Sequence, residues 1–151
     1  MKNQENQIYT VAAVMSCYNR RDKTIACLGA LLSNRLPENF VLKVYLVDDG
    51  SSDGSSAAVT ALYPQVNLIN GDGSLYWNGG MRKAWAAAAV GDFDYYLWLN
   101  DDTLLYNNAV ECLIKTASSS ENEGSLVIVV GSIIDPVTGL ISYGGRRSVS
   151  R

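Results

Sequence analysis

A chain of 151 residues, of which 48% are hydrophobic, is long enough for one globular domain with a buried core and too short for two ordinary domains. Its formal net charge of −3, with only the C-terminal stretch GGRRSVSR locally basic, argues against a nucleic-acid-binding protein, because phosphate recognition needs clustered Lys and Arg. The sequence contains no histidine, which excludes an imidazole base or a histidine metal ligand within these residues.

Apolar runs alternate with helical patterns along the chain, as expected of β-α-β units on a parallel sheet. The first half is predicted to contain a strand at 8–15, a helix at 22–34, a strand at 41–47 and a helix at 55–63 that ends before Pro64. The second half is predicted to contain a strand at 66–70, a Gly-rich loop at 71–80 and an Ala-rich helix at 81–90. A strand from Tyr95 and a helix near 107–118 follow. A fifth strand at 126–134 is predicted to turn at 135–139 into a hairpin-like return. No internal repeat or linker interrupts this pattern, so we predict a single α/β domain over residues 1–151.

The cysteines and the chain ends bear on location. Cys17, Cys27 and Cys112 are scattered and form no C-x-x-C pair, so neither a disulfide framework nor a zinc site is predicted, and a reducing cytosol suits them. The N-terminal MKNQENQ is polar and lacks the apolar core of a signal peptide, and the longest apolar run, LVIVVGSII, is too short to span a bilayer. We therefore expect a cytoplasmic protein without a membrane span.

Three polar loops follow predicted strands: SCYNRRD after the first, DDGSSDGS after the second and NDDT after the fourth. Ligands of open parallel sheets bind beyond the carboxyl ends of the strands, so these loops are expected to share one rim. Each loop has a simpler explanation, since Asp, Gly and Ser are common turn formers and one aspartate of NDDT can cap the following helix. Acidic pairs at two strand ends, Asp48–Asp49 and Asp101–Asp102, are not expected from turn chemistry alone, and we interpret them as a site.

Four clustered carboxylates without histidine or thiolate are hard oxygen ligands that suit Mg²⁺ or Mn²⁺ rather than zinc. A metal that bridges Asp102 to a diphosphate would relieve the repulsion between Asp101 and Asp102. Tyr18 beyond the first strand can stack on a base, and Asp48 or Asp49 can accept hydrogen bonds from a base or a ribose. The Gly-rich phosphate motifs of P-loop and dinucleotide-binding enzymes are both absent. The sequence therefore predicts a nucleoside diphosphate held through a metal.

The segments VAAVMSCYNRRDKTIACLGALL, VYLVDDGSSDGS and YYLWLNDDT, in this order, closely resemble the family 2 glycosyltransferases. The resemblance extends from about Ile8 to Gly145. It implies a GT-A type, Rossmann-like fold with a mostly parallel sheet flanked by helices, truncated after its nucleotide-binding half. It also implies inverting transfer of a sugar from a UDP- or dTDP-sugar to a saccharide or lipid-linked acceptor, in bacterial cell-wall or polysaccharide synthesis. A peripheral position at the inner membrane face is compatible with such work.

The resemblance implies roles for single residues. It places six residues at the nucleotide: Ser16, Tyr18, Asn19, Asp48, Asp49 and Asp101. Asp102 is implied to be the ligand of Mn²⁺ or Mg²⁺ and of the diphosphate. Asn100 stands where the family's D-x-D-type motif begins with Asp, which leaves Asp102 most of the metal binding.

The segment GSLYWNGGMRKAW resembles the donor-side loop and helix of bacterial members often described as rhamnosyltransferases, with Trp77, Gly79 and Gly80 in the loop. Aromatic residues of such a loop are also commonly core residues, and that alternative stays open.

A general base for the acceptor hydroxyl is not found in the sequence. The acidic residues after Asp102 are Glu111, Glu121, Glu123 and Asp135. The glutamates fall in or beside a predicted helix and Asp135 precedes a proline in a turn, so the base is expected beyond residue 151.

Other classes of protein fit less well. A receiver-type signalling domain or a haloacid-dehalogenase-like phosphatase needs acidic residues directly after the first strand, where this chain has SCYN. A nucleotidyltransferase acting on sugar phosphates would have a Gly-rich loop there, and this chain offers Arg20 and Arg21 without glycine. The nucleotidyltransferase and a folded fragment without activity remain as alternatives.

Overall fold

The computed structural model describes residues 7–120 and 126–143. The elements are β1 (Tyr9–Cys17), α1 (Arg21–Leu32), β2 (Phe40–Asp48), α2 (Ser55–Leu62), β3 (Asn67–Asn70), α3 (Tyr76–Ala89), β4 (Tyr95–Trp98), α4 (Ala109–Ser120), β5 (Ile133–Ile134) and β6 (Ile141–Tyr143). The kind and order of the first eight predicted elements are thereby confirmed. Within the described ranges, no helix is both long and apolar enough to cross a bilayer.

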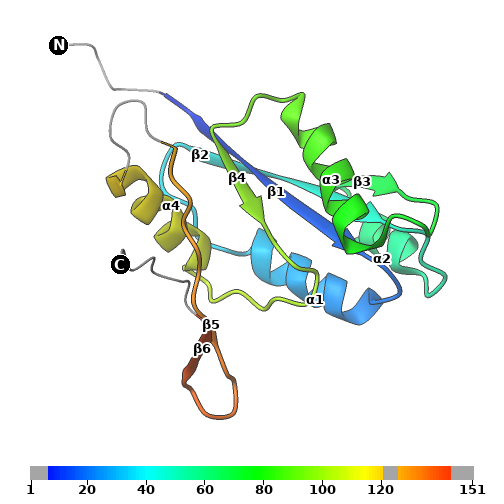
Figure 1. Cartoon of the computed structure of the whole chain (residues 1–151). Coiled ribbons are helices and arrows are strands. Elements are labelled where there is room, and N and C mark those ends of the chain that lie inside the picture. The colour runs from blue at the N-terminus through cyan, green and yellow to red at the C-terminus, as the bar shows by residue number, and fades with distance from the viewer. Residues whose placement is uncertain (1–6, 121–125, 144–151) are drawn as a thin grey trace, which may run out of the picture.

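The strands β1 to β4 form a parallel sheet in the order β3-β2-β1-β4 (Figure 1). The register pairs Cys17 at the end of β1 with Asp48 at the end of β2, so the loops that follow these strands start level with each other. The chain moves outward from β1 to β2 and β3 and then crosses to β4 on the other side of β1. The order of strands therefore reverses between β1 and β4, which is where open α/β sheets bind their ligands.

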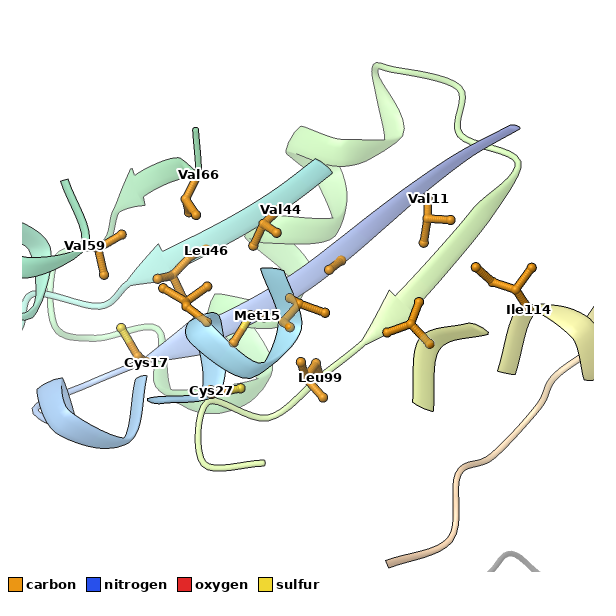
Figure 2. Close-up of a cluster of buried hydrophobic side chains, with 14 residues drawn as sticks. Val11, Met15, Cys17, Cys27, Val44, Leu46, Val59, Val66, Leu99 and Ile114 are labelled. Carbon is orange, nitrogen blue, oxygen red and sulfur yellow. The ribbon is translucent and has the colours of Figure 1, made fainter. Parts of the chain in front are cut away.

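Helices cover both faces of the sheet, and β1 shows why. Val11, Ala13, Met15 and Cys17 of β1 pack in one buried cluster, shown in Figure 2, with residues of α1, α2 and α4. The alternate residues of β1 pack on the other face against Met81, Ala84 and Ala88 of α3. A strand that is buried on both faces reads as a continuous apolar run, and YTVAAVMSC is such a run.

Helix α3 begins earlier than the sequence predicts. The Gly-rich stretch predicts a loop up to Gly80, whereas α3 starts at Tyr76, so Trp77, Gly79 and Gly80 lie in its first turns. The prediction was wrong because the first N–H groups of a helix need acceptors, and here the acceptor is the carboxylate of Asp49, a residue of a different loop. Local sequence patterns do not reveal a cap that comes from elsewhere in the chain.

The predicted fifth strand at 126–134 is wrong over most of its length. Only Ile133–Ile134 is a strand, and it pairs with β6 in a two-stranded antiparallel sheet. The hairpin-like return is confirmed, because Asp135 accepts the N–H groups of Val137 and Thr138 in the turn. The remaining apolar run, which includes the exposed Leu126, lies outside the main sheet (Figure 1). Strand preference needs a neighbouring strand to pair with, and residues 126–132 pair with no strand among the described residues.

Candidate functional site

The loops after β1 and β2 are joined at the carboxyl edge of the sheet by Asn19. Its backbone N–H donates to Ser51 Oγ at 2.9 Å, and its side-chain Oδ1 accepts from the backbone N–H of Ser52 at 2.8 Å. Asn19 has a φ of 49°, in the left-handed region that Asn tolerates better than most residues. The first two predicted loops therefore do share one rim, and Asn19 holds them together.

Asp48, at the end of β2, closes the turn that follows it. Its Oδ1 accepts the backbone N–H of Ser51 at 2.9 Å, and its Oδ2 accepts the hydroxyl of Ser56 at the start of α2. Asp48 is only 2% exposed. Both oxygen atoms thus already serve the fold, in the manner that turn chemistry predicts.

Asp49 is turned toward the start of α3. Its Oδ1 accepts the N–H of Gly73 at 3.0 Å, and its Oδ2 accepts the N–H groups of Leu75 and Tyr76 at 3.0 and 2.9 Å. The residue is 3% exposed. A carboxylate that accepts several backbone N–H groups anchors the segment that donates them. Asp49 therefore fixes the first turn of α3 to the end of β2.

The second acidic pair has a different partner, the guanidinium group of Arg20 from the loop after β1. Arg20 Nη1 lies 3.4 Å from Asp101 Oδ1 and 3.0 Å from Asp102 Oδ2. The side chain of Asp101 is 8% exposed, against 39% for Asp102 and 50% for Arg20. This single cation supplies the positive charge that the adjacent aspartates require, and it joins the loops on both sides of the point where the strand order reverses.

Asp101 combines burial with an unused oxygen. Burial raises the pKa of its carboxyl group above the ordinary value, although the Arg20 guanidinium and, more weakly, the Thr24 hydroxyl oppose this. Its Oδ2 is buried and makes no hydrogen bond of normal geometry within the described residues. A buried carboxylate oxygen that lacks a hydrogen bond of normal geometry is costly, and it can accept a further partner.

The start of α3 closes the fourth side of the rim. The indole Nε1 of Trp77 donates to Asn100 Oδ1 at 3.1 Å, so the predicted donor-side residue lies directly beside the NDDT loop. The side chains of Trp77 and Tyr18 are both more than half exposed, and a ligand has access to each of them. The open alternative that Trp77 is a core residue is therefore wrong.

Gly80 explains how α3 approaches the end of β1 so closely. A Cβ atom added to Gly80 would lie 1.9 Å from Ser16 Oγ and 2.8 Å from Ser16 Cβ. Ser16 is itself buried, so neither side has room to move aside. Glycine at this position lets the helix backbone pack against the strand end, and the backbone N–H of Gly79 donates to the carbonyl of Leu75 in the turn before it.

The four aspartates do not gather around one point, and the prediction of a four-carboxylate cluster is wrong. Over residues 7–120 and 126–143, no group of three or more His, Cys, Asp or Glu side chains is placed to hold a metal ion. The physical reason is that Asp48 and Asp49 turn to donors within the fold. Asp101 and Asp102 remain, and one or two carboxylates completed by substrate phosphates is a usual ligand set for Mg²⁺. The unpartnered Asp101 Oδ2 and the partly exposed Asp102 fit such a shared metal.

Space for a ligand adjoins Asp102. A hollow of about 330 Å³ is lined by Asp22, Lys23, Ala26, Asp102 and Leu104, between the first turns of α1 and the loop after β4. The remaining acidic candidates lie elsewhere: Glu111 pairs with Lys115 at 2.5 Å, and Asp135 is used in the β5–β6 turn. Glu121 and Glu123 lie outside the described residues.

Sequence reasoning missed the part that Arg20 plays at the site. Arg20 follows Tyr18 and Asn19 directly, so it had to lie on the same rim as NDDT. That adjacency was a usable signal, because a cation at one strand end and an acidic pair at the neighbouring strand end are natural partners. The sequence contains no comparable signal for the hydrogen bond between Trp77 and Asn100.

Comparison with known proteins agrees with this geometry. The sequence model of the family described as Glycosyl transferase family 2 matches residues 12–142. Hyaluronan synthase from Streptococcus pyogenes is 33% identical over 115 residues, which are 72% of this chain and 26% of that protein. The chain therefore spans about a quarter of the length of this curated relative.

Solved structures show the same fold. S. aureus TarS 1-349 in complex with UDP matches with a TM-score of 0.57 and 17% identity, over 73% of this chain and 32% of that one. The mannosyltransferase PcManGT from Pyrobaculum calidifontis, in complex with GDP-Man and Mn²⁺, matches with a TM-score of 0.57 and 19% identity, over 72% and 33%. Likeness at these identities establishes the GT-A fold alone. The family match covers most of the chain, including all three strand-end loops, and this chain belongs to glycosyl transferase family 2.

Proposed function

We propose that this chain is the nucleotide-sugar-binding part of an inverting, metal-dependent glycosyltransferase. The observation that carries the proposal is the Asp101–Asp102 pair at the reversal point of the sheet, with one buried oxygen that has no hydrogen-bond partner among the described residues and one partly exposed carboxylate beside an open hollow. Membership in family 2 supports sugar transfer. The two structural neighbours, one in complex with UDP and the other in complex with GDP-Man and Mn²⁺, support a nucleotide donor and a divalent cation.

The donor is proposed to lie across the rim, with its base on the β1–β2 side. Tyr18 is exposed and can stack on the base, while Ser16 and Asn19 shape the strand end beneath it. Asp48 and Asp49 hold this side in position, and a carboxylate has about four acceptor sites, of which Asp49 uses three. A base or ribose donor can use the fourth. We expect UDP or dTDP as the nucleotide.

The diphosphate is proposed to lie on the β4 side, next to Asp102 and with the ribose near Asp101. A bound Mn²⁺ or Mg²⁺ would neutralise the charge that develops on the leaving diphosphate. Asp102 would hold the cation, Trp77 would border the donor from the first turn of α3, and Gly80 keeps that turn close to the strand end. Inversion requires that the acceptor oxygen attack the anomeric carbon as the bond to the diphosphate breaks, with the acceptor proton passing to a carboxylate base. That base is proposed to lie outside residues 1–151.

The wider role follows from the relatives and is part of the same proposal. A hyaluronan synthase relative supports a saccharide or lipid-linked acceptor and polysaccharide or cell-wall synthesis in a bacterium. Work of that kind is expected in the cytoplasm, at the inner face of the membrane. The WNGG segment supports a rhamnosyltransferase-like donor preference.

The test is a thermal-shift panel with UDP, dTDP, GDP and CMP, each with and without Mn²⁺. Ligand at about a hundred times its dissociation constant should stabilise the fold by roughly 2.7 kcal/mol, a rise of a few degrees in Tm. Asp102→Ala should abolish the metal-dependent part of the rise. Glu38→Ala, which removes the same charge from an exposed loop residue before β2, should leave it unchanged. A folded protein that shows no metal-dependent rise with any of the four nucleotides would contradict the proposal.

A further inference from the structure

Arg20 occupies the place where a cation would act on the second acidic pair. One nitrogen, Nη1, contacts a carboxylate oxygen of each aspartate, at 3.4 Å from Asp101 and 3.0 Å from Asp102. The contact is local to the side chain, because the backbone of Arg20 is fixed by its carbonyl, which accepts the N–H of Thr24 in the first turn of α1. The guanidinium group can therefore leave without any change in the fold.

The energetics of this ion pair also favour replacement of the guanidinium group by a metal ion. Arg20 is half exposed and Asp102 more than a third exposed, and ion pairs that water reaches contribute little to stability. A divalent cation on the same oxygen of Asp102 would lie within a few ångströms of the guanidinium, and two positive groups so close repel each other. The guanidinium and a metal ion cannot both hold Asp102 Oδ2 in this arrangement.

We propose, building on the proposed function, that Arg20 makes metal binding at this site conditional on the nucleotide. In the nucleotide-free protein the guanidinium holds Asp102 and disfavours a free divalent cation. A diphosphate changes the balance, because its oxygen atoms match the planar fork of the guanidinium and draw Arg20 away from the carboxylate. Asp102 then becomes available to the cation that the diphosphate carries. Arg20 is a positioning residue in this scheme, acting through Asp102.

The test measures Mn²⁺ binding directly, by the electron paramagnetic resonance signal of free Mn²⁺ and by calorimetry, with and without UDP or the diphosphate selected by the thermal-shift panel. The unaltered chain should bind Mn²⁺ weakly alone and at least tenfold more tightly with the diphosphate. Arg20→Gln should bind Mn²⁺ alone about tenfold more tightly than the unaltered chain, which is the size expected for removing one nearby charge. The gain from adding the diphosphate should shrink by a similar factor.

Arg21→Gln is the matched control. It removes the same charge one residue along, and the contact that the structure gives Arg21, from its backbone N–H to Asp53 Oδ2 at 2.9 Å, does not involve the altered side chain. Arg20→Lys keeps the charge without the planar fork, and it should keep Mn²⁺ binding weak in the absence of nucleotide. Melting temperatures of all three variants show that each is folded.

The outcomes separate the two proposals. Equal Mn²⁺ affinity of Arg20→Gln and Arg21→Gln would overturn the role of Arg20, even if the diphosphate binds normally. If Arg20→Gln alone gains Mn²⁺ affinity but no variant binds any nucleoside diphosphate, the competition between Arg20 and the metal stands and the proposed donor is overturned. If no variant binds Mn²⁺ in either condition, both are overturned.

Discussion

Two pairs of adjacent aspartates end two strands of the same sheet, and the fold uses them in opposite ways. Asp48, the last residue of β2, and the following Asp49 are almost fully buried, and their side chains accept five hydrogen bonds from turn and helix donors. Asp101 and Asp102 after β4 have an arginine side chain as their charged partner, and one oxygen of Asp101 makes no hydrogen bond within the described residues. An apolar strand followed by Asp-Asp thus has two structural meanings, and the donors around the carboxylates decide between them.

The comparison predicts that the first pair stabilises the fold and the second does not. The largest effect is expected for Asp49→Ala, which leaves the N–H groups of Gly73, Leu75 and Tyr76 without their acceptor. We expect a loss of about 3 kcal/mol in the free energy of unfolding, measured by urea denaturation. Asp49→Asn should lose less, because an amide keeps one acceptor oxygen. A loss below about 0.5 kcal/mol for Asp49→Ala would show that α3 does not depend on this anchor.

A somewhat smaller loss is expected at the contact between α3 and β1. Gly80→Ala places a methyl group where Ser16 Oγ lies, and we expect it to cost about 1–3 kcal/mol through overpacking. Ser16→Gly removes both atoms of this contact, so it should cost less stability in the Gly80→Ala background than by itself, where glycine in a strand costs about 0.5–1 kcal/mol. A double-mutant cycle of melting temperatures measures the coupling. Additive effects would mean that the close approach of the two residues is not what Gly80 is needed for.

The second pair should tolerate neutralisation. Asp102→Asn removes one partner of a partly exposed ion pair, and we expect the free energy of unfolding to change by about 0.5 kcal/mol or less. Urea denaturation under the conditions used for Asp49→Asn gives a like-for-like comparison of the two loops. A loss above about 1.5 kcal/mol in the free energy of unfolding would contradict the difference between the two pairs, since Asp102 would then stabilise the fold as Asp49 does.

The smallest effect concerns two buried thiols, one beside each pair. Burial, with a further contribution from Asp48, raises the pKa of Cys17 to about 12, and burial raises that of Cys27 to about 11. A thiol reacts as its thiolate, which forms only as the pH approaches the pKa, so both should be inert to Ellman's reagent at pH 8. The exposed Cys112 should react at once, and all three should react after unfolding. Fast reaction of a second thiol in the folded protein would show that one of the two loops opens.

The sequence predicts the scaffold of this protein better than the use of its side chains. Periodicity locates β1 to β4 and their helices because each element carries its own pattern of apolar residues, and the strand ends then lie on one edge by topology. The start of α3 and the orientation of Asp49 escape prediction together, since a carboxylate from one loop caps a helix that begins 27 positions later. The apolar run at 126–134 has the local pattern of a strand, but it lies outside the main sheet, so the distant partner that a strand needs is missing from the part of the chain that the structure describes.

The contacts of Asn19 belong to a set of four links that connect the segments around the rim. Asn19 links the loops after β1 and β2, Asp49 links β2 to α3, Trp77 links α3 to Asn100, and Arg20 returns from the aspartates after β4 to the loop after β1. Four segments thus form a closed circuit, and the entropy of ordering them is lost when the chain folds instead of when a ligand arrives. Three of the links are hydrogen bonds internal to the scaffold, and the fourth is an exchangeable ion pair. A ligand that replaces the ion pair between Arg20 and the aspartates therefore binds to loops that are already ordered, and only this one contact has to break.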